Sequence, residues 1–331
     1  MADKVIKEHY VPRRHLRYFA NGDKFFVYDK EKKQQRPGNI NDYACERFFY
    51  DVDFDALKNE ILEQEPDFEF DPEMEKLLQE IDEQHIEHWF GQNVETWLFD
   101  PLDKISTLYT MSNPQILNSI DVLSEENMDY ISLFLAIQFM RSKEFRENIT
   151  ELHERLPMLL MKKFAKTQEE KDFANSVELK IKNENHKKVY HAQVLTDPEY
   201  AAHFAETFRA KIWMIGYNRT NMPFYTSDNP VVKFGHSGYS GFNSKGIEIF
   251  FPITTRLVLI LKDPEHFYFE IGNHNHFVEL DDVDVAFINS LQVQQSYRYV
   301  FDKSGDFKLA IGLMERNPKL SDIRHKRFLM G

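Results

Sequence analysis

The sequence predicts an α+β fold with three parts: an N-terminal arm and small β unit, a helical middle, and a C-terminal sheet rich in antiparallel strands. Between residues 55 and 216, apolar residues recur at helical spacing. From residue 223 onward, short aromatic and β-branched runs are separated by Gly, Pro, Asn and Ser. Because helices and strands are segregated along the chain, an alternating α/β sheet is not expected.

The predicted parts are residues 1–50, 51–216 and 217–331, which we expect to form one integrated globular unit together with the N-terminal arm. In the first part, the turn signal Asn21-Gly22-Asp23 precedes a strand at 25–28, and Arg36-Pro37-Gly38 is expected to form a second turn. With 42% hydrophobic residues, the chain of 331 residues has ample material for a buried core.

The helical middle is predicted to contain three well-marked helices. One begins after Ser124 as N-cap near 125–147 and is apolar on nearly all sides, which is typical of a buried helix. Another begins at Asp197 and Pro198 and is expected to end at Gly216. The third lies near 73–98 and is expected to be amphipathic. Its buried face should carry Leu77, Ile81 and Trp89, and its exposed face should carry Glu73, Glu80 and Glu87.

The C-terminal part is predicted to be mainly β, with one helix over 281–296. The expected strands share a high content of aromatic and β-branched residues, at 224–226, 231–234, 247–251, 257–261, 267–271 and 297–301.

The net charge of −13 is concentrated in one segment. Residues 51–100 hold 17 acidic side chains and two lysines, a net of −15, whereas residues 1–36 hold ten basic and five acidic side chains, a net of +5. Such charge runs are commonly solvated surface. The functional alternatives are a nucleotide or nucleic acid bound at the basic N-terminal segment and a basic protein partner bound at 51–100.

The single cysteine, Cys45, cannot form an intramolecular disulfide, which favours a reducing compartment. The first thirty residues lack an apolar signal-peptide core, and no apolar run reaches the ~18–20 residues of a membrane span. We therefore expect a cytoplasmic protein with no membrane partner. No motif predicts a metal site or identifies a cofactor, and the oligomeric state is not determined by the sequence.

The densest chemistry lies near the N-terminus, in His9-Tyr10-Val11-Pro12 and the arginines that follow. Terminal segments normally tolerate change, so an imidazole, a phenol and several guanidinium groups here indicate a role. His9 is a candidate catalytic acid or base, because histidine exchanges protons near neutral pH. Tyr10, Arg13 and Arg17 are candidate substrate-binding residues, the arginines as grips for an anion.

A second polar motif, Thr226–Pro230, lies between two predicted strands. Asp228 and Asn229 are candidate catalytic residues and Ser227 a candidate substrate contact, because catalytic groups often lie on loops at the rim of a sheet. The alternative is an Asx turn that only closes a hairpin.

Gln138 and Arg141 interrupt the buried helix near 125–147. Burying either side chain is costly unless it is paired. Arg141 is therefore expected to be mostly buried and bonded to a carboxylate, a backbone carbonyl or a bound anion. Both residues are candidates for substrate binding, and the alternative is an internal link that ties this helix to the sheet.

Together these segments resemble an uncharacterised family known by its N-terminal HYVP motif, domain of unknown function 4238. The resemblance is carried by segments spread over nearly the full chain: His9–Pro12, Leu16–Phe19, Ala136–Arg141, Thr226–Val231, Phe251–Thr254 and Tyr297–Val300. It implies a soluble microbial protein in which the polar motifs at both ends belong to one unit, and it assigns no catalytic residue.

Two hypotheses of function follow. The first is a hydrolase acting on phosphodiester or nucleotide substrates, nuclease-like, with His9, Asp228 and Arg141 meeting in an open cleft. The second is a non-enzymatic binding or sensor module, for example in antiviral defence, in which the same residues are buried and lock the arm onto the sheet. In both, the His9 arm is expected to pack near Ser227–Pro230.

Overall fold

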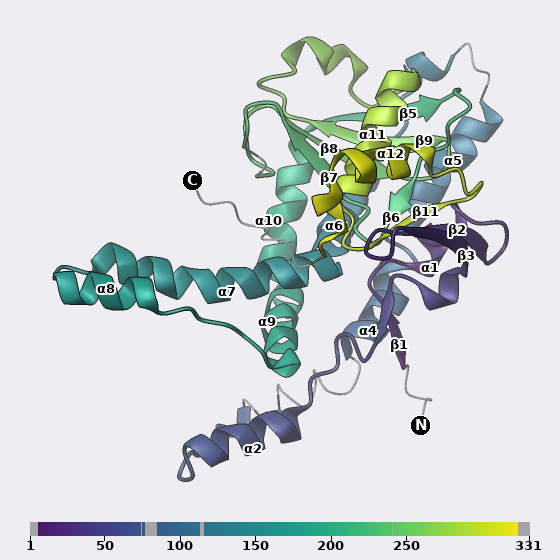
Figure 1. The fold of residues 1–331 in the computed structure, drawn as a ribbon. Helices are drawn as coiled ribbons and strands as arrows, with labels where there is room; N and C mark the ends of the chain where they lie inside the picture. The colour runs from purple at the N-terminus through teal and green to yellow at the C-terminus, as the bar shows by residue number, and fades with distance from the viewer. Residues whose placement is uncertain (1–5, 74, 77–84, 113–115, 240, 324–331) are drawn as a thin grey trace.

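The computed structural model describes residues 6–73, 75–76, 85–112, 116–239 and 241–323 (Figure 1). The described strands form three sheets, in which antiparallel pairs predominate, and the middle of the chain is helical. The predicted α+β class is therefore confirmed.

The largest described sheet has five strands in the order β10-β5-β9-β8-β7. Its strands are β5 (Ile212–Asn218), β7 (Val232–Gly235), β8 (Ile247–Pro252), β9 (Leu257–Lys262) and β10 (His276–Leu280). Strands β10 and β5 run parallel, and the other pairs in this sheet are antiparallel. Every residue of β5 is buried, because the strand lies inside the sheet and helices cover both faces.

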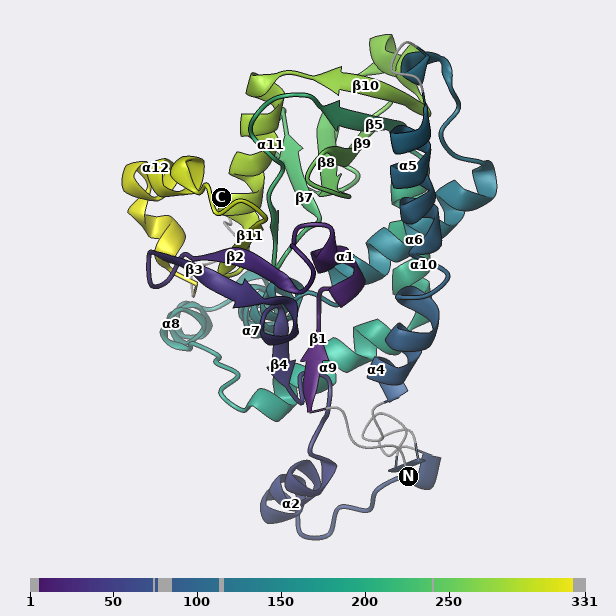
Figure 2. The same cartoon turned by 90° about the vertical axis from the view of Figure 1, so that its right-hand side faces the viewer.

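Figure 2 shows α6 (Glu125–Met140) and α10 (Pro198–Arg209) on one side of this sheet and α11 (Asp282–Gln295) on the other. The side chains of β5 alternate between these two sides of the sheet. Trp213 belongs to the core that contains α6, and its neighbour Met214 belongs to the core that contains α11. This alternation follows from the two-residue period of a strand.

A four-stranded sheet joins the two ends of the chain, in the order β3-β2-β11-β6. Its strands are β2 (Lys24–Asp29), β3 (Gln34–Asn39), β6 (Thr226–Ser227) and β11 (Tyr299–Asp302). Strand β11 pairs antiparallel with β2 on one side and β6 on the other, so the N-terminal strands and the Thr226 segment share one sheet. A further pair joins β1 (Lys7–His9) to β4 (Cys45–Arg47).

Helices make up most of the remaining structure. They are α1 (Arg13–Arg17), α2 (Phe54–Gln64), α4 (His85–Trp89), α5 (Asp100–Met111), α7 (Lys143–Phe164), α8 (Gln168–Ser176), α9 (Glu184–Thr196) and α12 (Lys308–Arg316). A π turn covers Phe90–Val94, and short 3-10 turns cover Ile40–Asp42, Leu117–Ser119, Tyr268–Asn273 and Pro318–Ser321. In Figure 1, α7 and α8 project from the body, and α9 packs against α7 near its base. None of the described helices is long and apolar enough to cross a membrane.

The predicted helix starts are confirmed. The hydroxyl of Ser124 accepts a hydrogen bond from the backbone N–H of Asn127 at 3.2 Å, and the carboxylate of Asp197 accepts one from Glu199 at 2.9 Å. Each bond satisfies a backbone donor that has no partner within the helix.

Two helix boundaries were predicted wrongly. The helix expected near 125–147 is two helices, because the chain turns at Arg141 and Ser142 caps α7 by accepting from the N–H of Phe145 at 3.1 Å. The helix from Pro198 ends at Arg209 instead of Gly216, because the apolar run that follows is the fully buried strand β5.

Three β assignments were also wrong. Arg36-Pro37-Gly38 lies inside β3, where proline is tolerated because β3 is an edge strand. Residues 267–271 fall mainly in the 3-10 turn, and the strand comes later, as β10. The strand expected at 224–226 is reduced to β6, which pairs with β11 over two residues.

In the acidic stretch, Leu77, Glu80 and Ile81 lie outside the described residues. Glu73 is exposed as predicted. Two other predictions were wrong. Trp89 was expected to be buried and is exposed, and Glu87 was expected to be exposed and is half-buried. The buried face of this helix carries Ile86 and Phe90, which lie four residues apart and so on one side of it.

Candidate functional site

The HYVP segment is buried. Nε2 of His9 lies 3.2 Å from the carbonyl oxygen of Ile40, and burial lowers the pKa of His9 to about 4, so its imidazole is neutral at pH 7. Tyr10 is also buried, with its ring 5.0 Å from that of Phe49. His9 is 7% exposed and Tyr10 is 2% exposed, so little of either side chain faces the solvent.

Helix α6 holds this segment by its backbone. Nε2 of Gln138 donates to the carbonyl of Tyr10 at 3.0 Å, and Nη2 of Arg141 donates to the carbonyl of His9. Arg141 is fully buried, lies 4.2 Å from the ring centroid of Phe90 and ion-pairs with Glu95 at 3.5 Å. The prediction that Arg141 is buried and bonded to a carboxylate or carbonyl is confirmed.

The Thr226–Pro230 motif carries the chain from the four-stranded to the five-stranded sheet. One carboxylate oxygen of the buried Asp228 accepts from the backbone N–H groups of Arg298 and Tyr299, both at 2.8 Å. Burial raises the pKa of Asp228 to about 6, against the effect of these donors. Side chains of the same loop bond to α11: Ser227 donates to Gln292 at 2.7 Å, and Asn229 donates to the carbonyl of Gln295 at 2.9 Å.

The arm meets this motif through a residue that the sequence analysis did not select. Nε2 of His15 lies 2.9 Å from the hydroxyl of Thr226, and both residues are fully buried. The ring of His15 packs against that of Phe251 at 4.9 Å. No local pattern distinguishes His15 from the cations around it, because its partner is 211 residues away. His9 and Asp228 do not share these partners, because His9 contacts the carbonyl of Ile40 whereas Asp228 accepts from Arg298 and Tyr299.

The N-terminal arginines lie at the surface, bonded to groups of the same chain. Arg13 donates to Asn41 at 3.1 Å, and Arg17 ion-pairs with Asp23 at 3.4 Å. Arg14 donates to two backbone carbonyls and ion-pairs with Asp100 at 2.7 Å and with Asp103. Much of the positive charge of this segment is therefore neutralised locally.

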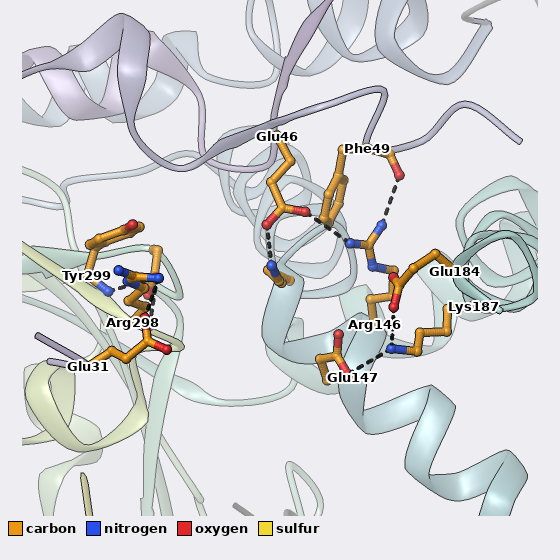
Figure 3. A network of polar contacts seen from close by, with 11 residues as sticks. Glu31, Glu46, Phe49, Arg146, Glu147, Glu184, Lys187, Arg298 and Tyr299 are labelled. Atoms are coloured by element: carbon orange, nitrogen blue, oxygen red, sulfur yellow. Dashed lines mark hydrogen bonds and ion pairs between the residues drawn. The ribbon is translucent and has the colours of Figure 1, made fainter. Parts of the chain in front are cut away.

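An open cleft of about 770 Å³ lies along α7. Its walls come from α7, the chain segment 178–181, the start of α9, Glu46 of β4, and Tyr297. Figure 3 shows the end of this cleft nearest the body, where Lys187 of α9 faces Glu147 and Arg146 of α7 reaches Glu46 and Phe49. We name the cleft the α7 cleft.

Three cations form the floor of the α7 cleft at this end. Nη1 of Arg146 donates to the carbonyl of Phe49 at 2.9 Å. The guanidinium of Arg146 lies 3.7 Å from the centroid of the Phe49 ring. Nζ of Lys143 lies 4.7 Å from the ring centroid of Tyr297. Nζ of Lys187 lies 2.7 Å from Glu184. Aromatic faces attract cations, so Arg146 and Lys143 are held by these ring contacts as well as by their ion pairs.

Two carboxylates of this end, Glu46 and Glu184, lie nearer the solvent than the cations. Glu46 pairs with both Lys143 and Arg146, the latter at 3.3 Å. The side chains of Lys143, Arg146 and Lys187 are 19%, 4% and 16% exposed, whereas those of Glu46 and Glu184 are 36% and 64% exposed. Glu46 and Glu184 thus cover the cations at the rim, an arrangement that can admit an anion if these two carboxylates move aside. Glu147 is 21% exposed and stays beside Lys187, at 3.9 Å.

The far end of the α7 cleft is more apolar. Met158 and Leu159 come from α7, and Leu179 and Ile181 from the segment that returns along it. Two hydrogen bonds hold that segment: the N–H of Ile181 donates to Glu154 at 2.9 Å, and the N–H of Leu179 to the sulfur of Met158 at 3.3 Å.

The sequence analysis did not select Lys143, Arg146 or Lys187. They belong to no motif, and Glu46, which joins two of them, precedes them by about 100 residues. Among the residues that the structure describes, no group of three or more His, Cys, Asp or Glu side chains is placed to hold a metal ion. Burial raises the pKa of Cys45 to about 11, so its thiol is not activated.

Residues 7–306 match the family model described as Protein of unknown function (DUF4238). The chain belongs to the DUF4238 family. The predicted resemblance is confirmed, and the matched range runs from β1 past β11, so it takes in α6, the Asp228 loop and all of the α7 cleft except Ile323. No curated protein and no solved structure matches this DUF4238 chain.

Proposed function

We propose that this protein is a binding module that holds a small phosphorylated ligand, of the nucleotide class, in the α7 cleft. The proposal is carried by the order of charges, with three cations at the floor and two carboxylates, Glu46 and Glu184, at the rim. A ligand phosphate can replace Glu46 and Glu184 beside Lys143, Arg146 and Lys187. Because Phe49 and Tyr297 already position two of these cations, little order has to be gained on binding.

The two ends of the cleft fit the two ends of such a ligand. Charge-assisted bonds to phosphate are strong, and arginine presents two parallel donors. Met158, Leu159, Leu179 and Ile181 at the far end offer apolar surface to a base or another apolar group. Small-molecule sites commonly combine apolar walls with a few placed polar groups.

The burial of His9, Arg141 and Asp228 supports a binding module over a hydrolase centred on those residues. A general acid or base must come within hydrogen-bond reach of its substrate. For His9 to do so, the arm would have to leave α6 and break the bonds from Gln138 and Arg141. We therefore assign His9 and Arg141 to locking the arm and Asp228 to holding the start of β11, as in the sensor hypothesis that includes a role in antiviral defence.

Two alternatives concern macromolecular partners. A nucleic acid could contact Arg13 and Arg17, whose side chains stay exposed beside their partners. A basic protein could dock on the acidic segment 51–100, where α2 is largely solvent-exposed. The local pairing of the N-terminal arginines leads us to prefer the α7 cleft for phosphate.

The test is a calorimetric titration of the full chain with ATP, AMP, inorganic phosphate and adenosine. We expect the two nucleotides to bind and adenosine to bind much more weakly. Lys143→Gln and Lys187→Gln should each raise the dissociation constant about tenfold, which corresponds to ~1.4 kcal/mol and the loss of one charge-assisted bond. The matched control is Lys308→Gln, a fully solvated lysine on α12.

The proposal would be overturned if the wild type and the three lysine variants bound the nucleotides with equal affinity, or if none of them bound a nucleotide. Phosphate release is measured in the same samples. Release that Lys143→Gln retains and a folded His9→Gln variant loses would favour the hydrolase. If binding of a polyanion is lost only in the double variant Arg13→Gln with Arg17→Gln, its binding site is the N-terminal segment.

A further inference from the structure

Lys233 lies on β7, an edge strand of the five-stranded sheet, and its backbone is held from both directions. On one side it pairs with Ile249 of β8. On the other side, Gln295 of α11 accepts from the N–H of Lys233 at 3.1 Å and donates to its carbonyl at 2.6 Å. The side chain of Lys233, which is half-buried, therefore leaves the sheet from a fixed point.

This side chain lies on the face of the sheet that carries α6. Its neighbour Val232 belongs to the core that contains α11, and successive side chains of a strand point to opposite faces. Nζ of Lys233 lies 4.3 Å from the ring centroid of Phe242 and 5.9 Å from that of Phe139 in α6. Both distances are within the ~6 Å over which an aromatic face attracts a cation.

We name these two rings, Phe139 and Phe242, the phenylalanine cage. Their centroids are 4.8 Å apart and their planes meet at 84°. Phe208 of α10 supports Phe242 at 4.9 Å. Phe242 comes from the connection between β7 and β8, yet it is only 7% exposed. The cage therefore surrounds the amine of Lys233 with hydrocarbon.

The amine of Lys233 has no hydrogen bond or ion pair with the residues that the structure describes. The fully buried Lys30 differs, because its ammonium group donates to two backbone carbonyls. A charged group taken out of water without a polar partner is costly, and the weak attraction of the two rings offsets only part of this cost.

The charged groups of this edge of the sheet lie on its other face. Glu248 is paired in register with Phe234, the neighbour of Lys233, so it points away from the cage. Glu248 binds His236 at 2.7 Å and Lys262 at 3.1 Å. The groups that face Lys233 are uncharged, and they come from α6, α11, β8 and the β7–β8 connection: Phe139, Gln295, Ile249 and Phe242.

This environment produces a reactive amine at neutral pH. Burial lowers the pKa of Lys233 to about 8. At pH 7 about one amine in ten is then uncharged, against roughly one in 2,500 for a solvated lysine with a pKa of ~10.4. The uncharged amine is the nucleophile, and desolvation in an apolar pocket is an established way to activate a lysine.

We propose that Lys233 is a modification site that accepts small acyl groups from acyl phosphates. The lone pair of Nζ attacks the acyl carbonyl, and a nitrogen–carbon bond forms. The carbon–oxygen bond to phosphate breaks, phosphate leaves with the bonding electrons, and one amine proton passes to the solvent. The product is an uncharged amide, which the phenylalanine cage accommodates better than the ammonium ion that it replaces. Methylation would leave the charge in place.

The site is independent of the proposed ligand, since neither Lys233 nor the phenylalanine cage lines the α7 cleft. The test is incubation of the full chain with acetyl phosphate at pH 7, followed by digestion with glutamyl endopeptidase and mass spectrometry. Cleavage after Glu206 and Glu248 gives one peptide that contains Lys233 and the exposed Lys245. Lys245 is thus a solvated control in the same peptide.

Lys233 should be acetylated about tenfold faster than Lys245 at pH 7. Its larger uncharged fraction gives the advantage, and its lower basicity removes part of it, because nucleophilicity falls with basicity. The acetylation rate of Lys233 should level off above about pH 8, whereas that of Lys245 should continue to rise to pH 9.5.

Phe242→Ala tests the role of the cage. Water then reaches the amine, so Lys233 should react about tenfold more slowly at pH 7, at a rate near that of Lys245. If exposure alone limited the reaction, the same change would make Lys233 react faster. The matched control is Phe269→Ala, at a phenylalanine that is 68% exposed, and it should leave the rate at Lys233 unchanged.

Several outcomes would overturn the proposal. One is a wild type in which Lys233 reacts no faster than Lys245, and another is a Lys233 rate that rises in parallel with that of Lys245 above pH 8. A folded Phe242→Ala protein that is acetylated at Lys233 as fast as the wild type would refute the cage. If that variant does not fold, the wild-type pH profile decides. Labelling of Lys233 by formaldehyde and borohydride, with no reaction with acetyl phosphate, would rule out the acyl donor.

Discussion

Nζ of Lys30 lies 2.8 Å from the carbonyl oxygen of Val293 and 2.7 Å from that of Ser296, where α11 ends. Lys30 directly follows β2 and is fully buried. The last carbonyls of a helix lack partners within the helix, and its C-terminal end favours positive charge. A residue of the N-terminal β unit thus caps a helix more than 260 residues later.

Lys30→Met should therefore destabilise the fold. The change keeps the apolar stem and removes the Lys30 donor from two buried carbonyls, which costs about 1–3 kcal/mol. The carbonyl of Val293 keeps the hydroxyl of Ser296 as a donor at 3.1 Å, so the main loss is at the carbonyl of Ser296. Urea denaturation measures the free energy of unfolding. Lys32→Met, on the exposed turn beside it, is the control and should change little. Equal stability of the two variants would contradict this role.

The His15–Thr226 bond predicts a coupling between the arm and the Asp228 loop. His15→Phe and Thr226→Val should each cost stability, because each leaves a buried polar partner alone. The double variant should be less unstable than the sum of the two, by about 1 kcal/mol. Strictly additive effects in a double-mutant cycle would show that the two groups do not interact.

Arg141→Ala should release the N-terminal arm. Removing one partner of a buried charged contact costs about 3–5 kcal/mol, and here the arm also loses its bond at the His9 carbonyl. Limited trypsin digestion under native conditions should cut after Arg13, Arg14 or Arg17 much faster than in the wild type. The control, Arg209→Ala, removes two partly exposed ion pairs on α10, to Glu125 and Asp129, and should cost about 1 kcal/mol. A wild-type digestion pattern and melting curve for Arg141→Ala would refute the locking role.

Glu8 makes stability depend on pH between about 4.5 and 8. Burial, assisted by the neighbouring Asp51, raises the pKa of Glu8 to about 8, although the N–H of Tyr50, which donates to Glu8 at 2.7 Å, acts to lower it. The folded state therefore holds this proton more tightly than the unfolded state, whose ordinary value is 4.5. Its contribution is complete below pH 4.5 and is lost as the pH rises toward 8, with a slope of at most about 1.4 kcal/mol per pH unit.

The neutral isostere Glu8→Gln should flatten this limb of the stability curve while keeping an acceptor for Tyr50. Unfolding by urea at a series of pH values in wild type and variant gives the comparison. Parallel curves between pH 4.5 and pH 8 would show that Glu8 is not the titrating group.

Elements with strong local signals were predicted well. The caps at Ser124 and Asp197 and the strands β8 and β9 depend on residues that are neighbours in sequence, so their patterns survive in the fold. The errors have tertiary causes. The run that begins at Ile212 suits a helix or a strand, and burial inside the five-stranded sheet decides for the strand.

The sequence by itself determined the α+β class, the family, the helix starts and the burial of Arg141, because these follow from periodicity, capping chemistry and the cost of an unpaired charge. Only the tertiary structure decided which groups meet. It joined His15 to Thr226, and Glu46 to Lys143 and Arg146, across separations of about 100 to 211 residues. It also placed three cations of the α7 cleft beneath Glu46 and Glu184. No local pattern specifies such pairs, because the chain between the partners leaves their separation in space undetermined until strands and helices have packed.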